Sequence, residues 1–298
     1  MKNILIIGCG LIGSSLLRVI TKKKIFKKIF VSENSKKNIF EIKKLKLPCI
    51  VSSDYKNIIP KVDLVIICTP MSEYEKIILK INKYLLPKTI ITDVGSSKES
   101  SLKLIKKKLK KGIRWTSSHP VSGSEVSGPE YGDKDLFLNK WCILIKEKDT
   151  NKKDLLTLAK FWKKIGSKIA TMNIKKHDAI FSMTSHLPHL IAYNLVKTAI
   201  DLEKSKKYDF IKFSAGGLRD FSRIAASNEI MWRDIFFQNQ YNIIKAIDLF
   251  IKNLKSFKKD IKEKNNKALI KKLIATKKVR KKIIRLKQDI DKPDFGRN

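Results

Sequence analysis

A glycine pattern near the amino terminus constrains the fold of this chain more than any other feature. The apolar run Ile4–Ile7 leads directly into Gly8-x-Gly10-x-x-Gly13, and the residues that follow carry helical spacing. The first glycine permits a tight turn from strand to helix, the second lets the backbone approach a pyrophosphate, and the third lets helix and strand pack closely. The sequence therefore predicts a strand-turn-helix unit that binds a dinucleotide.

An acidic residue indicates which dinucleotide is bound. Glu33 lies 20 positions after Gly13, at the end of a second apolar run, where its carboxylate can accept hydrogen bonds from ribose hydroxyls. A carboxylate there repels a 2′-phosphate, which favours NAD over NADP. Lys36 and Lys37 lie just beyond and could contact such a phosphate instead, so NADP remains the less favoured alternative.

The first part of the chain alternates apolar runs with helical patterns, which predicts crossover units and a mainly parallel, doubly wound sheet. The expected strands are 3–8, 28–32, 48–51, 62–68, 89–93, 113–118 and 141–146. The expected helices between them are 11–23, 36–46, 72–85 and 98–110. One strand ends at Thr69 and Pro70, and in such folds that carboxyl end lies beside the cofactor, where strand order reverses. The predicted cofactor-binding residues are Gly8, Gly10, Leu11, Ile12, Gly13, Glu33, Thr69 and Pro70.

Beyond about Asn173 the strand pattern gives way to long helical stretches, at 176–204, 219–226, 229–254 and 257–288. Pro188 should kink the first of them, because proline lacks an N–H and clashes with the preceding turn. The apolar stripes are wider than one short bundle needs, which predicts a homodimer formed through these helices. We therefore expect an α/β N-terminal Rossmann-type domain at 1–172, an all-α C-terminal domain at 173–298, and a loose tail at Lys292–Asn298.

Composition limits the possible partners. The formal charge of +37 comes almost entirely from lysines spread along the chain, whereas proteins that read bases and phosphates rely on the planar fork of arginine. We therefore expect no specific nucleic-acid partner. No run of about 18 apolar residues could span a bilayer, and the four cysteines lack paired or metal-ligand spacing. These features predict a cytoplasmic protein without a membrane partner or a metal site.

Several polar segments do not fit a packing role. Asp93-x-Gly95-Ser96-x-Lys98 and His119-Pro120-x-x-Gly123-x-Glu125 each follow a predicted strand. In the helical part lie Ser185-His186-Leu187-Pro188-His189 and Gly216-Gly217-x-x-Asp220-Phe221-x-Arg223. With the glycine start, these segments occur in the order seen in the prephenate/arogenate (cyclohexadienyl) dehydrogenase family. The chain resembles that family from residue 1 to about residue 255.

The resemblance implies an NAD-dependent oxidoreductase of tyrosine biosynthesis. In that reaction hydride leaves C4 of prephenate or arogenate, the C4 hydroxyl loses a proton, and loss of CO₂ yields an aromatic ring. His119 matches the family's catalytic histidine, a residue type that titrates near neutrality. Ser96 matches the serine that hydrogen-bonds this histidine. Their other possible roles are a loop histidine with satisfied hydrogen bonds and a helix N-cap serine.

The resemblance also implies a set of substrate-binding residues. Arg223 matches the arginine that clamps the ring carboxylate, a task suited to its planar fork. His189 matches a pocket histidine, while Ser124 and Glu125 match a pair on a loop that gates access. The implied substrate-binding residues are Arg223, His189, Ser185, Ser124 and Glu125.

Three other interpretations compete with this one. His186 and His189 share a helix face and could bind zinc, but no cysteine or carboxylate nearby completes a ligand set. A 3-hydroxyacid dehydrogenase or imine reductase has the same two-domain layout, but the former usually carries a lysine followed four residues later by asparagine. Here Lys197 is followed by Asp201. A protein that senses nucleotides or binds polyanions without catalysis is favoured only by net charge.

Overall fold

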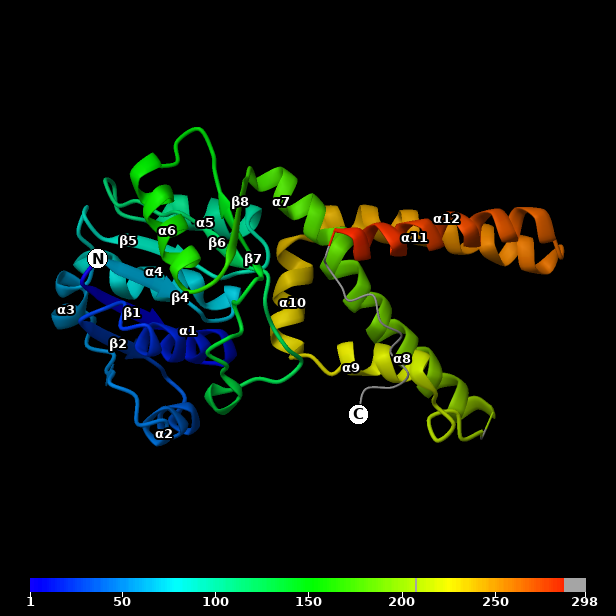
Figure 1. The fold of residues 1–298 in the computed structure, drawn as a ribbon, viewed down its shortest axis with the longest axis horizontal. Coiled ribbons are helices and arrows are strands. Elements are labelled where there is room, and N and C mark those ends of the chain that lie inside the picture. The colour runs from blue at the N-terminus through cyan, green and yellow to red at the C-terminus, as the bar shows by residue number, and fades with distance from the viewer. Residues whose placement is uncertain (207, 287–298) are drawn as a thin grey trace.

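The computed structural model describes residues 1–206 and 208–286, and it has an α/β part followed by an extended helical part (Figure 1). The main sheet has five parallel strands in the order β3-β2-β1-β4-β5. Its strands are β1 (Asn3–Ile7), β2 (Lys28–Ser32), β3 (Ile50–Val51), β4 (Leu64–Ile67) and β5 (Ile90–Asp93). This architecture confirms the predicted fold class. The strand order reverses between β1 and β4, so the carboxyl ends of these two strands flank the crevice where such folds bind ligands.

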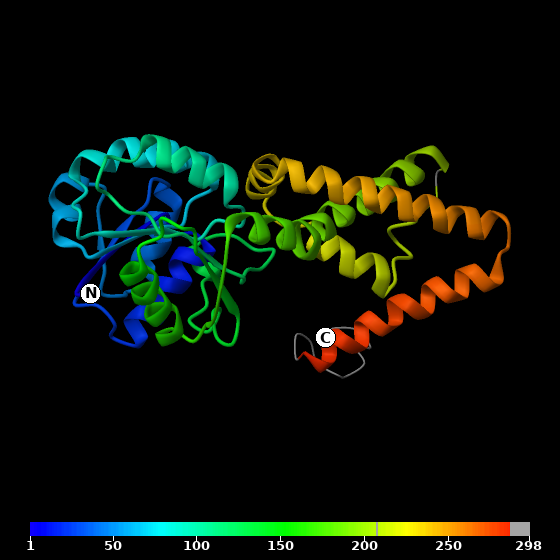
Figure 2. The same ribbon diagram turned by 90° about the horizontal axis from the view of Figure 1, so that it is seen from above.

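Helices cover both faces of this sheet because side chains of successive strand residues point to opposite faces. The helices are α1 (Leu11–Lys22), α2 (Lys36–Lys44), α3 (Tyr55–Ile58), α4 (Tyr74–Ile81), α5 (Glu99–Lys108) and α6 (Lys152–Lys164), with single 3₁₀ turns at Ile59–Lys61, Met71–Glu73, Asn82–Tyr84 and Pro129–Tyr131. In Figure 2, α4 and α5 lie on one face, while α1 and α6 lie on the other. Two separate buried clusters result, one under each pair of helices.

A second sheet of three strands extends the first. Its strands are β6 (Ser118–Pro120), β7 (Trp141–Ile145) and β8 (Lys168–Met172). Strand β6 runs antiparallel to β7, whereas β7 and β8 are parallel. The predicted strand 113–118 was therefore wrong in its position. In that segment only Trp115 forms a bridge to the main sheet, opposite Ile91 of β5. The regular strand begins at Ser118 and pairs with β7 instead. Strand β8 and helix α6 were not predicted from the sequence.

The helical part begins directly after β8. It contains α7 (Ile174–Phe181), a π-helical turn (Ser182–His186), α8 (Leu187–Lys206), α9 (Gly216–Ile224), α10 (Glu229–Gln238), α11 (Gln240–Lys262) and α12 (Asn266–Arg285). A kink was predicted at Pro188. The structure has a π-helical turn that ends two residues before the proline, and Pro188 is the second residue of α8.

Two predicted helix boundaries were wrong. The expected helix 229–254 breaks at Asn239, whose buried side-chain amide donates a hydrogen bond to the Asp178 carbonyl and takes the residue out of helical geometry. The next helix, α11, then continues to Lys262, and the chain reverses where Lys264 adopts a positive φ of 50° and Asn265 caps α12. The expected loose tail, and the last two residues of the expected helix 257–288, lie outside the described residues.

The helical part is docked on the carboxyl edge of the main sheet through α7 and α10. The Asp178 carboxylate of α7 accepts hydrogen bonds from the backbone N–H groups of Lys98 and Glu99 at the start of α5. The Ser72 N–H, just after β4, donates to the Asp234 carboxylate of α10 at 2.9 Å. Helix α11 extends away from this junction, and α12 turns back after the chain reversal (Figure 2). Among the described helices, none is both long enough and apolar enough to cross a membrane.

Candidate active site

The three glycines after β1 have the geometry that a pyrophosphate site requires. Gly8 adopts a φ of +85°, and a side chain there would lie 2.7 Å from the Thr69 methyl group. At Gly13 a Cβ atom would lie 2.2 Å from the Gly8 carbonyl oxygen, so only glycine lets α1 approach β1 this closely. Gly10 faces open space, and no side chain caps α1. The free N–H groups at the start of α1 can therefore face an anion.

Glu33 lies at the end of β2 against this turn. Its Oε2 atom accepts a hydrogen bond from the Cys9 N–H at 2.8 Å, and its Oε1 atom accepts from the N–H groups of Asn34 and Ser35. Across the strand reversal, the hydroxyl of Thr69 is buried without a partner among the described residues. The structure thus brings the predicted cofactor residues to one edge of the sheet, with Leu11 and Ile12 half-buried and Pro70 exposed.

A buried ion pair lies behind this edge, at the end of β5. Lys98 Nζ lies 2.6 Å from Asp93 Oδ2 and 2.7 Å from the Ser118 carbonyl oxygen, and both side chains are inaccessible to solvent. Ser117 Oγ donates to Asp93 Oδ1 at 2.7 Å, so each carboxylate oxygen has a strong partner. A buried pair needs such complete hydrogen bonding to offset desolvation. The pair ties β5, the start of α5 and β6 together, and β6 carries His119.

His119 is buried in β6 and contacts a histidine from the helical part. Its Nδ1 atom lies 2.8 Å from His177 Nε2, and His177 Nδ1 lies 2.7 Å from Asp178 Oδ1. His119 is 6% exposed, whereas His177 and Asp178 are fully buried. Neither His177 nor Asp178 was predicted from the sequence to belong to the site. The available signal was that the chain has only four histidines and that an aspartate directly follows this one.

Burial keeps these imidazoles neutral. Desolvation, followed by the charges of His177, Lys98 and His186, lowers the pKa of His119 well below its usual value near 6.5. Desolvation also lowers the pKa of His177, although the hydrogen bond that His177 donates to Asp178 acts in the opposite direction. At neutral pH His119 is therefore an unprotonated base, with one ring nitrogen engaged by His177.

The other two histidines occupy different surroundings in the turn before α8 and at its start. His186 is fully buried; its Nδ1 atom pairs with Asn239 at 3.1 Å, and desolvation lowers its pKa to about 4. His189 stacks on Trp232 with ring centroids 3.8 Å apart, and its Nδ1 atom lies 2.8 Å from the Ser185 carbonyl oxygen. Within the described residues, no three metal-ligating side chains gather into a possible ion site.

Arg223 lies near the end of α9 and faces the loop after β6. Its Nη1 atom is 3.5 Å from Glu125 Oε2, and Ser124 Oγ donates to the same carboxylate at 3.1 Å. The Arg223 side chain is 41% exposed. Its charge is close enough to lower the pKa of His189, after the larger effect of burial. The structure therefore brings Arg223, Glu125 and Ser124 together, and Ser185 contacts His189 through its carbonyl oxygen.

Ser96 is half-buried in the turn between β5 and α5. Among the described residues its hydroxyl makes no hydrogen bond with His119, whose Nδ1 atom is engaged by His177 instead. The backbone of Ser96 faces His186 and raises the pKa of that histidine slightly against the effect of burial. A role for Ser96 beside the base stays a prediction.

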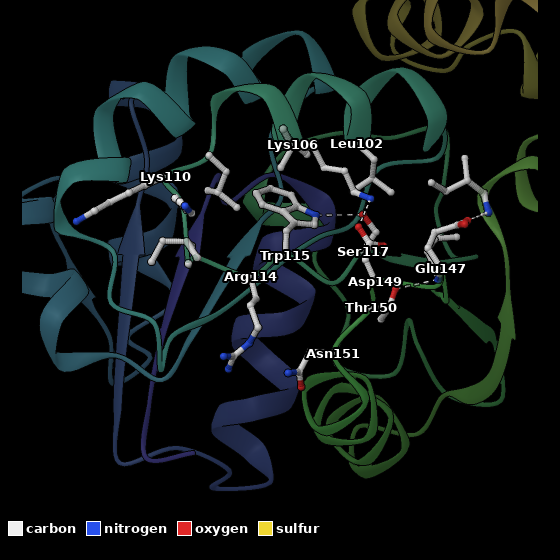
Figure 3. A pocket seen from close by; sticks show the side chains of 17 residues that line it. Leu102, Lys106, Lys110, Arg114, Trp115, Ser117, Glu147, Asp149, Thr150 and Asn151 are labelled. Carbon is white, nitrogen blue, oxygen red and sulfur yellow. Dashed lines mark hydrogen bonds and ion pairs between the residues drawn. The ribbon is translucent and has the colours of Figure 1, made fainter.

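A pocket of about 280 Å³ lies on the other side of the Asp93 carboxylate, under α5 (Figure 3). Trp115 and Ser117 form its inner wall, and both donate hydrogen bonds to Asp93 Oδ1. Two of its cations are already paired, Lys106 with Asp149 and Arg114 with Asp154. None of the predicted site residues lines this pocket.

Comparison with known proteins identifies the family. Residues 17–171 match the family model described as the nucleotide-binding domain of prephenate dehydrogenase, and residues 173–275 match its dimerization domain. The chain belongs to the prephenate dehydrogenase family. The first match begins at residue 17, just after the glycine turn.

Individual relatives resemble this prephenate dehydrogenase family member over nearly its whole length. The cyclohexadienyl dehydrogenase of Zymomonas mobilis is 32% identical over 297 residues, which span 97% of this chain and 98% of that protein. The crystal structure of prephenate dehydrogenase from Aquifex aeolicus, in complex with hydroxyphenyl propionate and NAD⁺, is 32% identical with a TM-score of 0.88, covering 95% of this chain and 98% of that one. Synechocystis arogenate dehydrogenase, at 21% identity and a TM-score of 0.74 over 94% and 99% of the two chains, shares the fold.

The buried histidines predict that acid destabilises the protein before its carboxylates titrate. Because the pKa of His186 falls from 6.5 unfolded to about 4 folded, the unfolded chain binds the proton first as the pH falls below 6.5. Stability is therefore lost between pH 6.5 and 4, and His186 alone should remove roughly 2 kcal/mol from the free energy of unfolding between pH 7 and pH 5. Urea unfolding at the two pH values checks this, with His186→Gln as the control. An equal loss in wild type and variant would contradict the assignment.

Proposed function

We propose that this chain oxidises and decarboxylates prephenate, arogenate or both, with hydride transfer to NAD, as a step of tyrosine biosynthesis. Its membership of the prephenate dehydrogenase family supports this, and so does the likeness to a structure that holds NAD⁺. The observation that carries the proposal is the buried, neutral His119 in β6, a strand that is hydrogen-bonded through Ser118 to the carboxyl end of β5. A dehydrogenase acting on an alcohol needs a base of this kind beside its nicotinamide.

The chemistry assigns His119 the proton. NAD, held at the glycine turn and Glu33, would supply the acceptor for the hydride that leaves C4 of the substrate. His119 takes the proton of the C4 hydroxyl on its Nε2 atom. The Nδ1 atom is unavailable for this step because it pairs with His177. Ser96, in the turn after β5, is proposed to contact the same hydroxyl or the base once substrate is bound. Loss of CO₂ from C1 then aromatises the ring.

Substrate anchoring is assigned to the cluster around Arg223. A planar guanidinium can bind the ring carboxylate through two parallel hydrogen bonds and so hold C4 toward the cofactor. His189 and Ser185 form the adjoining wall, with His189 held in place by its stacking on Trp232. Glu125 pairs with Arg223 here and would have to release it as the substrate carboxylate arrives, so Glu125 and Ser124 gate the site.

The two parts of the chain divide this work. We propose that residues 1–172 bind the cofactor and that residues 173–298 bind substrate and form a homodimer. The match to the family's dimerization domain supports the second assignment. The outer helices also expose apolar side chains that a second copy could cover. They include Leu195, Leu202, Ile244, Leu249, Leu254 and Leu273.

A test of this function also tests the base. Purified protein mixed with NAD and either prephenate or arogenate should generate the absorbance of reduced nicotinamide, and the ratio of the two rates reveals the preferred substrate. His119→Asn should lower turnover by roughly 10²- to 10⁴-fold, because general-base catalysis contributes about that much. NAD affinity, measured by calorimetry, should change little. Near-normal turnover in this variant would remove His119 from the mechanism.

Cofactor choice is predicted to depend on Glu33. Its carboxylate lies against the Cys9 N–H of the glycine turn, where it would repel a 2′-phosphate. Glu33→Ser should therefore improve NADP use relative to NAD, with Lys36 and Lys37 supplying positive charge. Steady-state kcat/KM with each cofactor measures the ratio. A wild-type enzyme that already prefers NADP would contradict the assignment of Glu33 to the ribose.

Arg223 should contribute chiefly to substrate binding. Because the clamp to the ring carboxylate holds in both ground and transition states, Arg223→Ala should raise KM strongly and lower kcat only as far as ring alignment is lost. Losing one side of a charge-assisted pair costs about 3–5 kcal/mol when the pair is buried, so kcat/KM should fall by about two to four orders of magnitude. Arg223→Lys should rescue it only in part, because an ammonium cannot form two parallel bonds.

The control for this variant is NAD affinity, which should not change because Arg223 belongs to the helical part. If KM in Arg223→Ala stays within twofold of the wild-type value, the carboxylate binds elsewhere, and His189 becomes the next candidate.

A further inference from the structure

We infer that His177 and Asp178 are positioning residues that hold the proton of neutral His119 on Nδ1 and so leave Nε2 as the base. The inference rests on the proposed function in one respect, since it takes His119 as the residue that accepts the substrate's proton. It assigns a role to two side chains of α7, which lies in the helical part rather than in the part that carries His119.

Asp178, His177 and His119 form a chain of two hydrogen bonds, here called the relay. Which atom donates in each bond follows from the chemistry of the carboxylate. A carboxylate can only accept, so the 2.7 Å contact with Asp178 Oδ1 requires that His177 carries its proton on Nδ1. Neutral His177 then has a bare Nε2 atom. The 2.8 Å contact with His119 Nδ1 can form only if His119 donates, so the proton of His119 is on Nδ1. Its Nε2 atom keeps the lone pair that a general base needs.

Backbone N–H groups donate to the carboxylate of Asp178, the first member of the relay. Asp178 Oδ1 accepts from the Lys98 N–H at 3.0 Å, and Oδ2 accepts from the Glu99 N–H at 2.8 Å. Both donors are at the N-terminus of α5, where the helix dipole favours a negative charge. A protonated Asp178 would lose one of these bonds, so the anion is the form that the fold selects.

The charges around His119 and His177 show why an anion is needed beside His177. Lys98 lies close enough to lower the pKa of both His119 and His177, and His186 acts on His119 in the same direction. Asp93 offsets Lys98 through their 2.6 Å contact. When His119 accepts the substrate's proton, the new positive charge is 2.8 Å from His177, and Asp178 is the carboxylate at the far end of that relay.

Asp178→Asn tests the direction of these hydrogen bonds, because it preserves the shape of the side chain but can place a donor where the carboxylate accepts from His177. The N–H groups of Lys98 and Glu99 should hold the amide oxygen, which turns the amide NH₂ toward His177 Nδ1. His177 must then donate from Nε2, and His119 is left with its proton on Nε2, the wrong tautomer for a base. Turnover should fall by roughly 10²- to 10⁴-fold, KM should change little, and the acidic limb of kcat should shift to lower pH because the imidazolium has lost its counter-charge.

A pair of substitutions at His177 separates hydrogen bonding from packing. His177→Phe keeps an aromatic ring beside His119 and Phe181 but removes the acceptor, so it should lose a similar fraction of turnover. His177→Gln can offer its amide oxygen to His119 Nδ1 and its NH₂ to Asp178, so it should recover at least tenfold over the phenylalanine variant. Asn173→Ala is the matched control, because Asn173 caps α7 without touching the relay and its loss should leave kcat unchanged.

Nitrogen-15 NMR of histidine-labelled protein reports the tautomers without any activity measurement. Wild-type His119 should show a protonated Nδ1 and a bare Nε2, and Asp178→Asn should exchange the two. A wild-type His119 protonated on Nε2 would overturn the inference, as would a His177→Phe variant with wild-type kcat and pH profile. If wild-type protein turned over neither prephenate nor arogenate while showing the expected tautomer, the proposed function would fail and the relay would stand.

Discussion

The rest of this site depends on the hydrogen bonds that the buried carboxylate of Asp178 accepts. It accepts the backbone N–H groups that open α5, and so docks the first helix of the helical part on the carboxyl edge of the sheet. The same carboxylate bonds His177, which in turn bonds His119. One group therefore joins the two parts of the chain and, through His177, fixes the ring of His119, the residue proposed as the base.

A second buried network fixes the strand that carries the same histidine. The pair of Asp93 and Lys98 links β5 to the backbone of Ser118, one residue before His119. Each carboxylate oxygen of Asp93 has several donors, which is the condition under which a buried ion pair is tolerated. His119 is thus fixed through its strand by one carboxylate and through its ring by another. Such preorganisation reduces the reorganisation that a proton transfer would otherwise require.

Local signals in the sequence were sufficient for the glycine turn and the five parallel strands of the main sheet, although not for β6, β8 and α6. The three glycines, the alternation of strands and helices, and the acid after the second strand each reflect a short-range requirement of backbone or packing, and the structure has the glycine turn beside the strand reversal. The helix boundaries at Asn239 and Lys262 could not be predicted from local signals. Asn239 breaks a helical pattern because its side chain bonds Asp178 across 61 residues, and no local pattern reports such a contact.

By itself, the sequence determined the fold class, the family and most residues proposed for the site, because these depend on residue types in fixed order and spacing. The tertiary structure decided which partner orients His119. The motifs pointed to Ser96, whereas the docking of α7 places His177 at the Nδ1 atom. It also decided that Arg223 meets Glu125, from a helix and a loop 98 positions apart. Hydrogen bonds between distant segments require a specific packing of two units, and that packing arises only when the whole chain has folded.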